Sequence, residues 1–230
     1  MSKWTRYTTA GKEGQRRPTQ HVEFGPGEVD GLDRRLLGDV EGHRILELGA
    51  GAGHSAIALA KQGARVVAID PAIEEIETAR AAAEVAEVHI ELHNTGLADL
   101  ASLPADAFDA VVSIHSLASV SNIDRVFRQV HRLLKSDRPL VISLPHPAAL
   151  MIDPDDSVNI VASYAEAEPL GTKHHLTYRH GIGDVFTQLT RANFRVDTLL
   201  EPAQKEKSKK ADGPKNAPAS VIFRARKIGT

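Results

Sequence analysis

The chain has 230 residues, of which 42% are hydrophobic and 25% charged, as is ordinary for a globular protein with one core. Its formal charge of -2 gives no electrostatic reason to expect a nucleic-acid or membrane partner, and its zero cysteines exclude disulfides, thiolate catalysis and Cys-ligated zinc. No apolar run approaches the roughly 20 residues that span a bilayer, and residues 1–20 lack the apolar core of a signal peptide. We therefore expect a cytoplasmic protein whose residues 1–230 form a single domain.

Residues 1–30 form the predicted N-terminal extension. Its first part is basic, with Trp4 and Tyr7 as the large side chains. One interpretation is a solvated terminus. The other is a lid over a binding site, with Trp4 or Tyr7 folded inward. A short helix over Gly31–Gly38, which ends at a glycine, follows this extension.

The stretch from Arg44 to Gly63 reads as a strand, a tight turn and a helix. Glycines stand at alternate positions of the turn, Gly49, Gly51 and Gly53, and a helix of small residues follows over His54–Gln62. Glycine tolerates positive φ and lets a ligand approach the backbone, while the start of a helix presents free N–H groups. The turn indicates a nucleotide-like ligand. Tight packing alone is the other interpretation.

Strand-like and helix-like segments alternate after the turn, which is typical of a parallel sheet wrapped by helices. Residues 42–144 form the expected ligand-binding core, and 146–180 form a variable region where the alternation stops. Residues 203–219 read as a solvated loop, with a phosphate-binding arm as the alternative. The predicted strands are 64–70, 88–92, 108–114, 139–144, 194–202 and 220–227, and the predicted helices after the turn are 71–83, 122–135 and 181–193.

Two common nucleotide-binding motifs are not matched by the residues of this turn. The NAD fingerprint needs a glycine where His54 stands, and no Gly-Lys-Ser/Thr follows the turn as a phosphate-binding loop requires. The chain instead resembles the class I S-adenosylmethionine-dependent methyltransferases, whose pattern E-x-G-x-G-x-G is matched by Glu47 and the three glycines. The resemblance extends over about 42–228. It implies an α/β, Rossmann-like, mostly parallel sheet of seven strands with helices on both faces. The strand order would be 3-2-1-4-5-7-6, numbered along the chain, with the seventh antiparallel.

The resemblance also implies the cofactor, S-adenosylmethionine, and a role for particular residues. Glu47 would meet the ammonium group, and Asp70 would accept the two ribose hydroxyls. Asp99 would take the adenine amino group, although on its own it could be only a helix cap. The Leu100 backbone N–H would take a ring nitrogen, and Ser113 would lie under the methionine part. The expected cofactor-binding residues are Glu47, Gly49, Ala50, Gly51, Gly53, Asp70, Pro71, Asp99, Leu100 and Ser113.

The sequence says less about the groups that would contact the molecule that accepts the methyl group. His115 and His146 follow predicted strands and are the candidate bases, with a hydrogen-bonded rim histidine as the alternative for each. His174, His175 and His180 lack the spaced carboxylates of a metal site, so we expect no metal.

The segments SLPHPAAL and TYRHGIGDVFTQLTRANFRVDTLLEP look like those of small-molecule methyltransferases of the ubiquinone/menaquinone-biosynthesis-like group. The resemblance implies metal-independent methyl transfer by in-line displacement to a small organic acceptor, by a monomer or homodimer. The variable region 146–180 and residues 1–30 would then form the acceptor pocket. An RNA or protein methyltransferase and a non-catalytic S-adenosylmethionine-binding domain are the alternatives.

Overall fold

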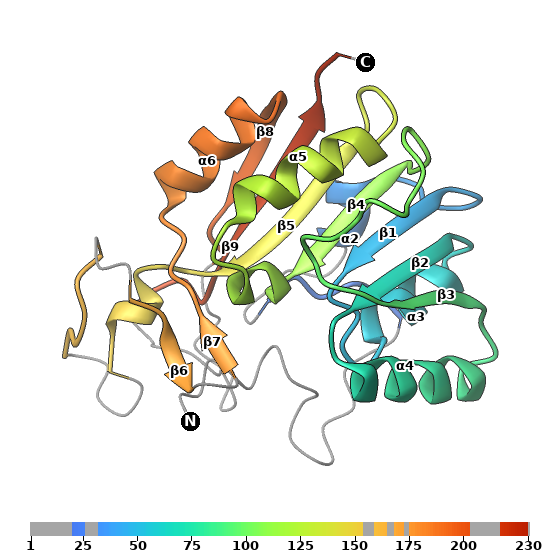
Figure 1. Cartoon of the computed structure of the whole chain (residues 1–230), viewed down its shortest axis with the longest axis horizontal. Coiled ribbons are helices and arrows are strands. Elements are labelled where there is room, and N and C mark those ends of the chain that lie inside the picture. The colour runs from blue at the N-terminus through green and yellow to red at the C-terminus, as the bar shows by residue number, and fades with distance from the viewer. Residues whose placement is uncertain are drawn as a thin grey trace.

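A mixed sheet organises the fold in the computed structural model, which describes residues 20–25, 32–153, 159–164, 168–172, 175–202 and 217–229 (Figure 1). Strand β9 is antiparallel to both its neighbours, and the other pairs are parallel. The order β3-β2-β1-β4-β5-β9-β8 confirms the predicted one, because β8 and β9 are the sixth and seventh strands of this sheet. The strands are β1 (Arg44–Leu48), β2 (Arg65–Asp70), β3 (Ile90–Asn94), β4 (Ala110–Ile114), β5 (Pro139–Pro145), β8 (Phe194–Leu200) and β9 (Ser220–Lys227).

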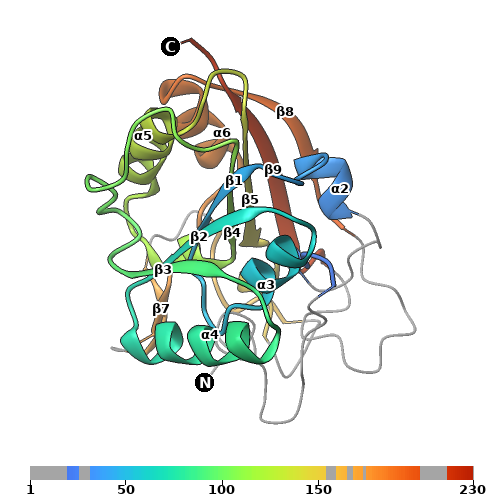
Figure 2. The same cartoon turned by 90° about the vertical axis from the view of Figure 1, so that its right-hand side faces the viewer.

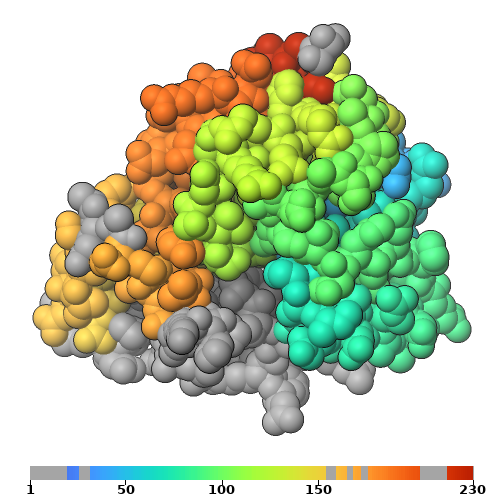
Figure 3. All heavy atoms as spheres, viewed as in Figure 1, coloured from blue at the N-terminus to red at the C-terminus, as the bar shows by residue number. Residues whose placement is uncertain are grey.

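Helices cover both faces of the sheet (Figure 2). Helices α5 (Ile123–Leu133) and α6 (Ile182–Arg191) pack side by side on one face, which Figure 3 shows from outside. Helices α2 (Leu32–Leu37) and α3 (His54–Lys61) cover the other, and α4 (Ile73–Val85) packs beside α3 against β2 and β3. Successive strand residues point to opposite faces. Leu46 therefore joins the core under α5, while Ile45 joins the core under α3.

Helix starts differ in how their free N–H groups are satisfied. Helix α5 begins after Asn122, whose side chain accepts from the Arg125 N–H at 3.3 Å. Its apolar stripe is buried as the spacing predicts. Helix α3 begins after Gly53, which has a left-handed backbone and supplies no side-chain cap. The first turn of α3 is therefore open to other acceptors. No helix among the described residues is long and apolar enough to cross a membrane.

The described part of the N-terminal extension, residues 20–25, is packed against the sheet. Val22 and Phe24 are fully buried in the core under α3, and the Ser143 hydroxyl donates to the Phe24 carbonyl. The Asp33 carboxylate accepts from the Val22 N–H at 3.3 Å. These contacts make residues 20–25 part of the sheet's covering layer. Trp4 and Tyr7, on which the lid interpretation depends, lie outside the described residues.

The variable region contains short elements that the sequence did not predict. Strands β6 (Leu170–Thr172) and β7 (His175–Thr177) form a separate hairpin, and η2 (Ala149–Met151) is a single 3-10 turn. A second such turn, η1 (Ser116–Ser119), lies outside this region, after β4. Elements of three or four residues are too short to show periodicity. The predicted strand at 88–92 begins two residues late, at Ile90, because the Val88 N–H closes the end of α4 by donating to the Ala83 carbonyl.

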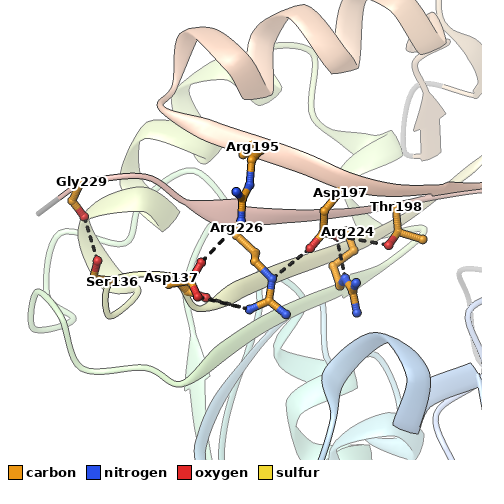
Figure 4. Close-up of polar contacts among 8 residues, drawn as sticks. All are labelled: Ser136, Asp137, Arg195, Asp197, Thr198, Arg224, Arg226 and Gly229. Atoms are coloured by element: carbon orange, nitrogen blue, oxygen red, sulfur yellow. Dashed lines mark hydrogen bonds and ion pairs between the residues drawn. The ribbon is translucent and has the colours of Figure 1, made fainter.

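Strands β8 and β9 are joined by ion pairs as well as backbone bonds (Figure 4). Asp197 lies at a bulge in β8 and accepts from Nε of Arg224 at 2.7 Å and from Nε of Arg226 at 2.9 Å. Burial alone would raise the pKa of Asp197, but these two hydrogen bonds outweigh it and hold the pKa below its ordinary value. The loop between these strands falls mostly outside the described residues.

Candidate cofactor and acceptor site

The glycine turn lies at the carboxyl end of β1, where the strand order reverses between β1 and β4 and open α/β sheets bind ligands. The N–H groups of Gly49 and Ala50 both donate to the Ile69 carbonyl at 2.9 Å. All three glycines of the turn have positive φ: 84° at Gly49, 49° at Gly51 and 82° at Gly53. The turn is thus fixed to β2, and its backbone conformation is one that side chains disfavour.

The three glycines serve different purposes. A Cβ on Gly49 would lie 2.1 Å from the Ser116 Cβ, and one on Gly53 would lie 3.0 Å from the Ala79 Cβ. A Cβ on Gly51 would meet nothing nearer than the Glu75 Oε2 at 4.0 Å. Packing therefore requires Gly49 and Gly53, whereas Gly51 is the glycine that leaves room for a ligand.

Asp70 ends β2 beside this open position. Its Oδ2 accepts from the Gly51 N–H at 3.0 Å, and its Oδ1 accepts from the Ala72 N–H at 2.9 Å. Each carboxylate oxygen keeps a lone pair for a further donor. Pro71 follows directly and is exposed, and its carbonyl accepts from the Asn94 side chain at 3.0 Å. The carboxylate is thus held in place, as the predicted recognition of paired hydroxyls requires.

Glu47 points from β1 toward the first turn of α3 and is only 2% exposed. Burial raises its pKa from 4.5 to about 8, against the effect of hydrogen bonds from the Ala56 backbone and the Ser55 side chain; the nearby Asp70 charge raises it further. Its Oε2 has no hydrogen-bond partner. A buried carboxyl oxygen without a partner fits a cationic group such as the ammonium of the expected cofactor.

Glu75, in the first turn of α4, is a site residue that the sequence did not single out. Its Oε2 is enclosed and unpartnered, and it is the atom nearest to the open face of Gly51. Burial, followed by the charges of Asp70 and Glu74, raises the pKa of Glu75. Glu47, Asp70 and Glu75 thus place three carboxyl groups around one turn. A ligand that carries sulfonium and ammonium groups would lower their mutual repulsion.

The adenine-side predictions are only partly compatible with the structure. The Leu100 N–H donates to the Gln129 Oε1 at 2.9 Å, and the same side chain donates to the Ala98 carbonyl at 2.6 Å. A ligand reaches this N–H only when the Gln129 side chain moves away, and the bond from the Leu100 N–H to the ring nitrogen stays a prediction. Asp99 is exposed and begins no helix, which removes the cap interpretation.

Ser113 supports the turn from below. It is fully buried, and its Oγ is 2.6 Å from the Ser116 Oγ, which donates to the Leu48 carbonyl. Ser113 therefore lies beneath the glycine turn, and its place under the methionine part of the cofactor stays a prediction. Ser113 and Ser116 form a brace beneath Gly49, and the sequence could not show this pairing because it depends on η1.

The two candidate bases are both buried and hydrogen-bonded. His115 is 2% exposed, has a left-handed backbone, and its Nε2 is 2.9 Å from the Ser220 Oγ. His146 is 5% exposed; its Nδ1 accepts from the Ala148 N–H at 3.1 Å, and its Nε2 is 2.6 Å from the Glu201 Oε1. An acceptor Nδ1 leaves the proton on Nε2, which donates to the carboxylate. In this arrangement His146 has no free lone pair, and the contacts of both histidines favour the interpretation as hydrogen-bonded rim residues.

Over the described ranges, no group of three or more histidine, aspartate or glutamate side chains is placed to hold a metal ion. His174 and the side chain of His175 lie outside those ranges. His180 lies just before α6.

Comparisons with known proteins agree with this geometry. Residues 46–142 match the family model described as "Methyltransferase domain". The crystal structure of an S-adenosylmethionine-dependent methyltransferase from Mesorhizobium loti has the same fold, with a TM-score of 0.73 and 24% identity over 84% of this chain and 95% of that one. The chain belongs to the class I S-adenosylmethionine-dependent methyltransferases, and S-adenosylmethionine is its cofactor.

Relatives with more specific names are also similar. The ubiquinone biosynthesis O-methyltransferase of Xanthomonas oryzae is 31% identical over 166 residues, which make up 71% of this chain and 66% of that relative's length. The 1,6-didemethyltoxoflavin-N1-methyltransferase of Burkholderia thailandensis has a TM-score of 0.60 and 17% identity over 82% of this chain and 72% of that one. Its structure holds 1,6-didemethyltoxoflavin and S-adenosylhomocysteine.

Proposed function

We propose that this enzyme transfers the methyl group of S-adenosylmethionine to a hydroxyl of a small organic acceptor, without a metal. The observation that carries the cofactor part of the proposal is a group of three carboxyls at the glycine turn. Asp70 accepts from the Gly51 N–H, Glu75 lies at the open face of Gly51, and the buried Glu47 lies near enough to Asp70 for their charges to interact. The names of the ubiquinone-biosynthesis relatives support a small hydroxylated acceptor.

The cofactor supplies a sulfonium methyl that is already electrophilic, so alignment of the acceptor for in-line displacement can carry most of the rate enhancement. In this proposal Glu47 holds the ammonium group and Asp70 the ribose hydroxyls. Gly51 lets the ligand lie against the backbone. Ser113 and Ser116 keep the turn rigid from below, so the methyl group has a fixed position relative to the acceptor.

Two alternatives make different predictions. An RNA methyltransferase would bind RNA with an affinity that falls steeply as salt rises, whereas a flat salt dependence would end that alternative. A non-catalytic domain would bind S-adenosylmethionine and S-adenosylhomocysteine without releasing product. We further propose a cytoplasmic monomer or homodimer that has no nucleic-acid partner; light scattering of the purified chain tests the oligomeric state.

A melting scan tests the cofactor part first. Either sulfur ligand at about 100 times its dissociation constant should stabilise the protein by about 2.7 kcal/mol, or roughly 5 to 10 °C, and NAD should do nothing. A panel of phenols and catechols, assayed for S-adenosylhomocysteine release in the presence of EDTA, then tests the acceptor. Binding without release for every acceptor would contradict the proposed function.

A further inference from the structure

His180 is a histidine of the acceptor side whose ring has an unused nitrogen. It lies between β7 and α6, and its Nε2 is enclosed and has no hydrogen-bond partner. A buried polar atom without a partner is unfavourable, so such atoms in enzymes often face a ligand. Neither His146, with both nitrogens occupied, nor His115, with Nε2 bonded to Ser220, offers this nitrogen.

The position of His180 connects it to the glycine turn through η1. Strand β7 packs against η1, and the Tyr178 N–H donates to the Ala118 carbonyl at 2.7 Å. The His180 ring makes hydrogen bonds with the backbone of Leu117 and Val120. Ser116, at the other end of η1, is the residue that braces Gly49. One 3-10 turn therefore separates His180 from the residues that fix the cofactor.

The charge state of His180 suits a proton acceptor. Burial lowers its pKa below the ordinary 6.5, and the two backbone hydrogen bonds and the charge of Asp184 on α6 only partly oppose this. Tyr178, just after β7, lies with its ring centre 6.5 Å away, and Arg179 is the chain neighbour of His180. The polar groups of η1 are serine hydroxyls and backbone. At neutral pH the ring is therefore uncharged and able to take a proton.

We propose that His180, and not His115 or His146, faces the acceptor and takes its proton during methyl transfer. The inference rests on the proposed function. The acceptor oxygen forms a bond to the methyl carbon as the carbon–sulfur bond breaks, and that electron pair stays on sulfur as S-adenosylhomocysteine forms. The hydroxyl proton passes to His180, which then loses it to water, so no other reactant is needed.

His180→Gln tests the proposal, with catechol as the acceptor probe. The control is His89→Gln, which changes an exposed histidine just before β3, at the opposite edge of the sheet. We expect kcat to fall about 100-fold in His180→Gln, with the affinity for S-adenosylhomocysteine unchanged and the His89 variant like the wild type. The fall of kcat/KM on the acid side, due to protonation of His180, should disappear in His180→Gln. A variant that keeps both the rate and the acid-side fall would overturn the proposal.

A second measurement tests the protonation state of His180 and needs no acceptor. Nitrogen-15 NMR of the histidine side chains reports the protonation state of Nε2 directly. The His180 signals are identified as those missing from the His180→Gln spectrum. We expect a neutral ring at about pH 6.5 with the lone pair on Nε2. A charged ring at that pH, or a proton on Nε2, would overturn the proposal. If the wild type binds S-adenosylhomocysteine but does not methylate catechol, the phenolic acceptor of the proposed function is contradicted. The NMR measurement still tests the protonation state of His180 in that case.

Discussion

Glu47 should make the ligand-free protein less stable as the pH rises, and Glu47→Gln should remove this effect. The carboxyl is 2% exposed and its pKa is raised to about 8, whereas its ordinary value is 4.5. Between these two values the folded chain keeps a proton that the unfolded chain releases. The unfolded state then binds fewer protons, so the free energy of unfolding falls as the pH rises.

The size of this effect follows from the two pKa values. At about 1.36 kcal/mol for each unit of pKa, proton linkage gives a loss of about 3 kcal/mol between pH 5 and pH 8. For a chain of this length the loss corresponds to roughly 10 °C in Tm. Glutamine has nearly the same shape and can still accept from the Ala56 backbone, but it does not ionise. The carboxyl can release its proton when an ammonium group binds beside it, whereas the amide cannot ionise, so affinity for S-adenosylhomocysteine should fall at least about tenfold in Glu47→Gln.

Guanidinium unfolding of the ligand-free protein across this pH range, followed by circular dichroism, measures the effect. The matched control is Glu77→Gln, which removes an exposed carboxyl on α4. We expect the wild type and the Glu77 variant to lose stability together as the pH rises, and Glu47→Gln to lose about 3 kcal/mol less. If Glu47→Gln shows the same pH dependence as the wild type, the assigned burial of a protonated Glu47 is refuted.

Three further predictions concern the glycine turn, the division of the site and the sheet edge. Gly49→Ala should lower the free energy of unfolding by about 3 kcal/mol, because the new Cβ meets Ser116. Gly51→Ala should lower it by only about 1 kcal/mol and should mainly weaken S-adenosylhomocysteine binding. Denaturant unfolding measures the first effect and calorimetry the second. Calorimetry should also show that Asp70→Ala weakens that binding at least about tenfold while His146→Ala leaves it nearly intact; equal losses would contradict the separation of cofactor and acceptor sides. Asp197→Asn should lower the free energy of unfolding by about 1 kcal/mol at neutral pH. The difference between this variant and the wild type should vanish as the pH falls below 3.8 and through the lowered pKa of Asp197. A difference that persists in acid would argue against the ion pairs.

The cofactor half of the site could be predicted because its signals are local in the sequence. Glu47, the glycines and Asp70 stand at the ends of two successive strands, and parallel strands bring their carboxyl ends to one edge. The pattern could not separate the glycines by role, because Ser116, which lies against Gly49, comes from a distant segment. Glu75 was missed because a glutamate in the first turn of a helix is most often an exposed residue.

The acceptor half could not be predicted because its contacts join segments far apart in the chain. The environment of His146 depends on Glu201, just after β8, and that of His115 on Ser220, the first residue of β9; both partners are far away in the sequence. The Leu100 N–H is taken by Gln129 of α5, a pairing with no local signal. His180 was weighed only as a metal ligand, because the packing of β7 on η1 that encloses its ring is invisible in the pattern.

The most direct test of the proposed function is transfer of a labelled methyl group. The 230-residue chain is incubated with methyl-labelled S-adenosylmethionine, EDTA and a panel of catechols and phenols, and both products are quantified. We expect a labelled methyl ether and S-adenosylhomocysteine in equal amounts, with little of either in Asp70→Ala. Tight binding of S-adenosylmethionine with no labelled product from any acceptor would contradict it.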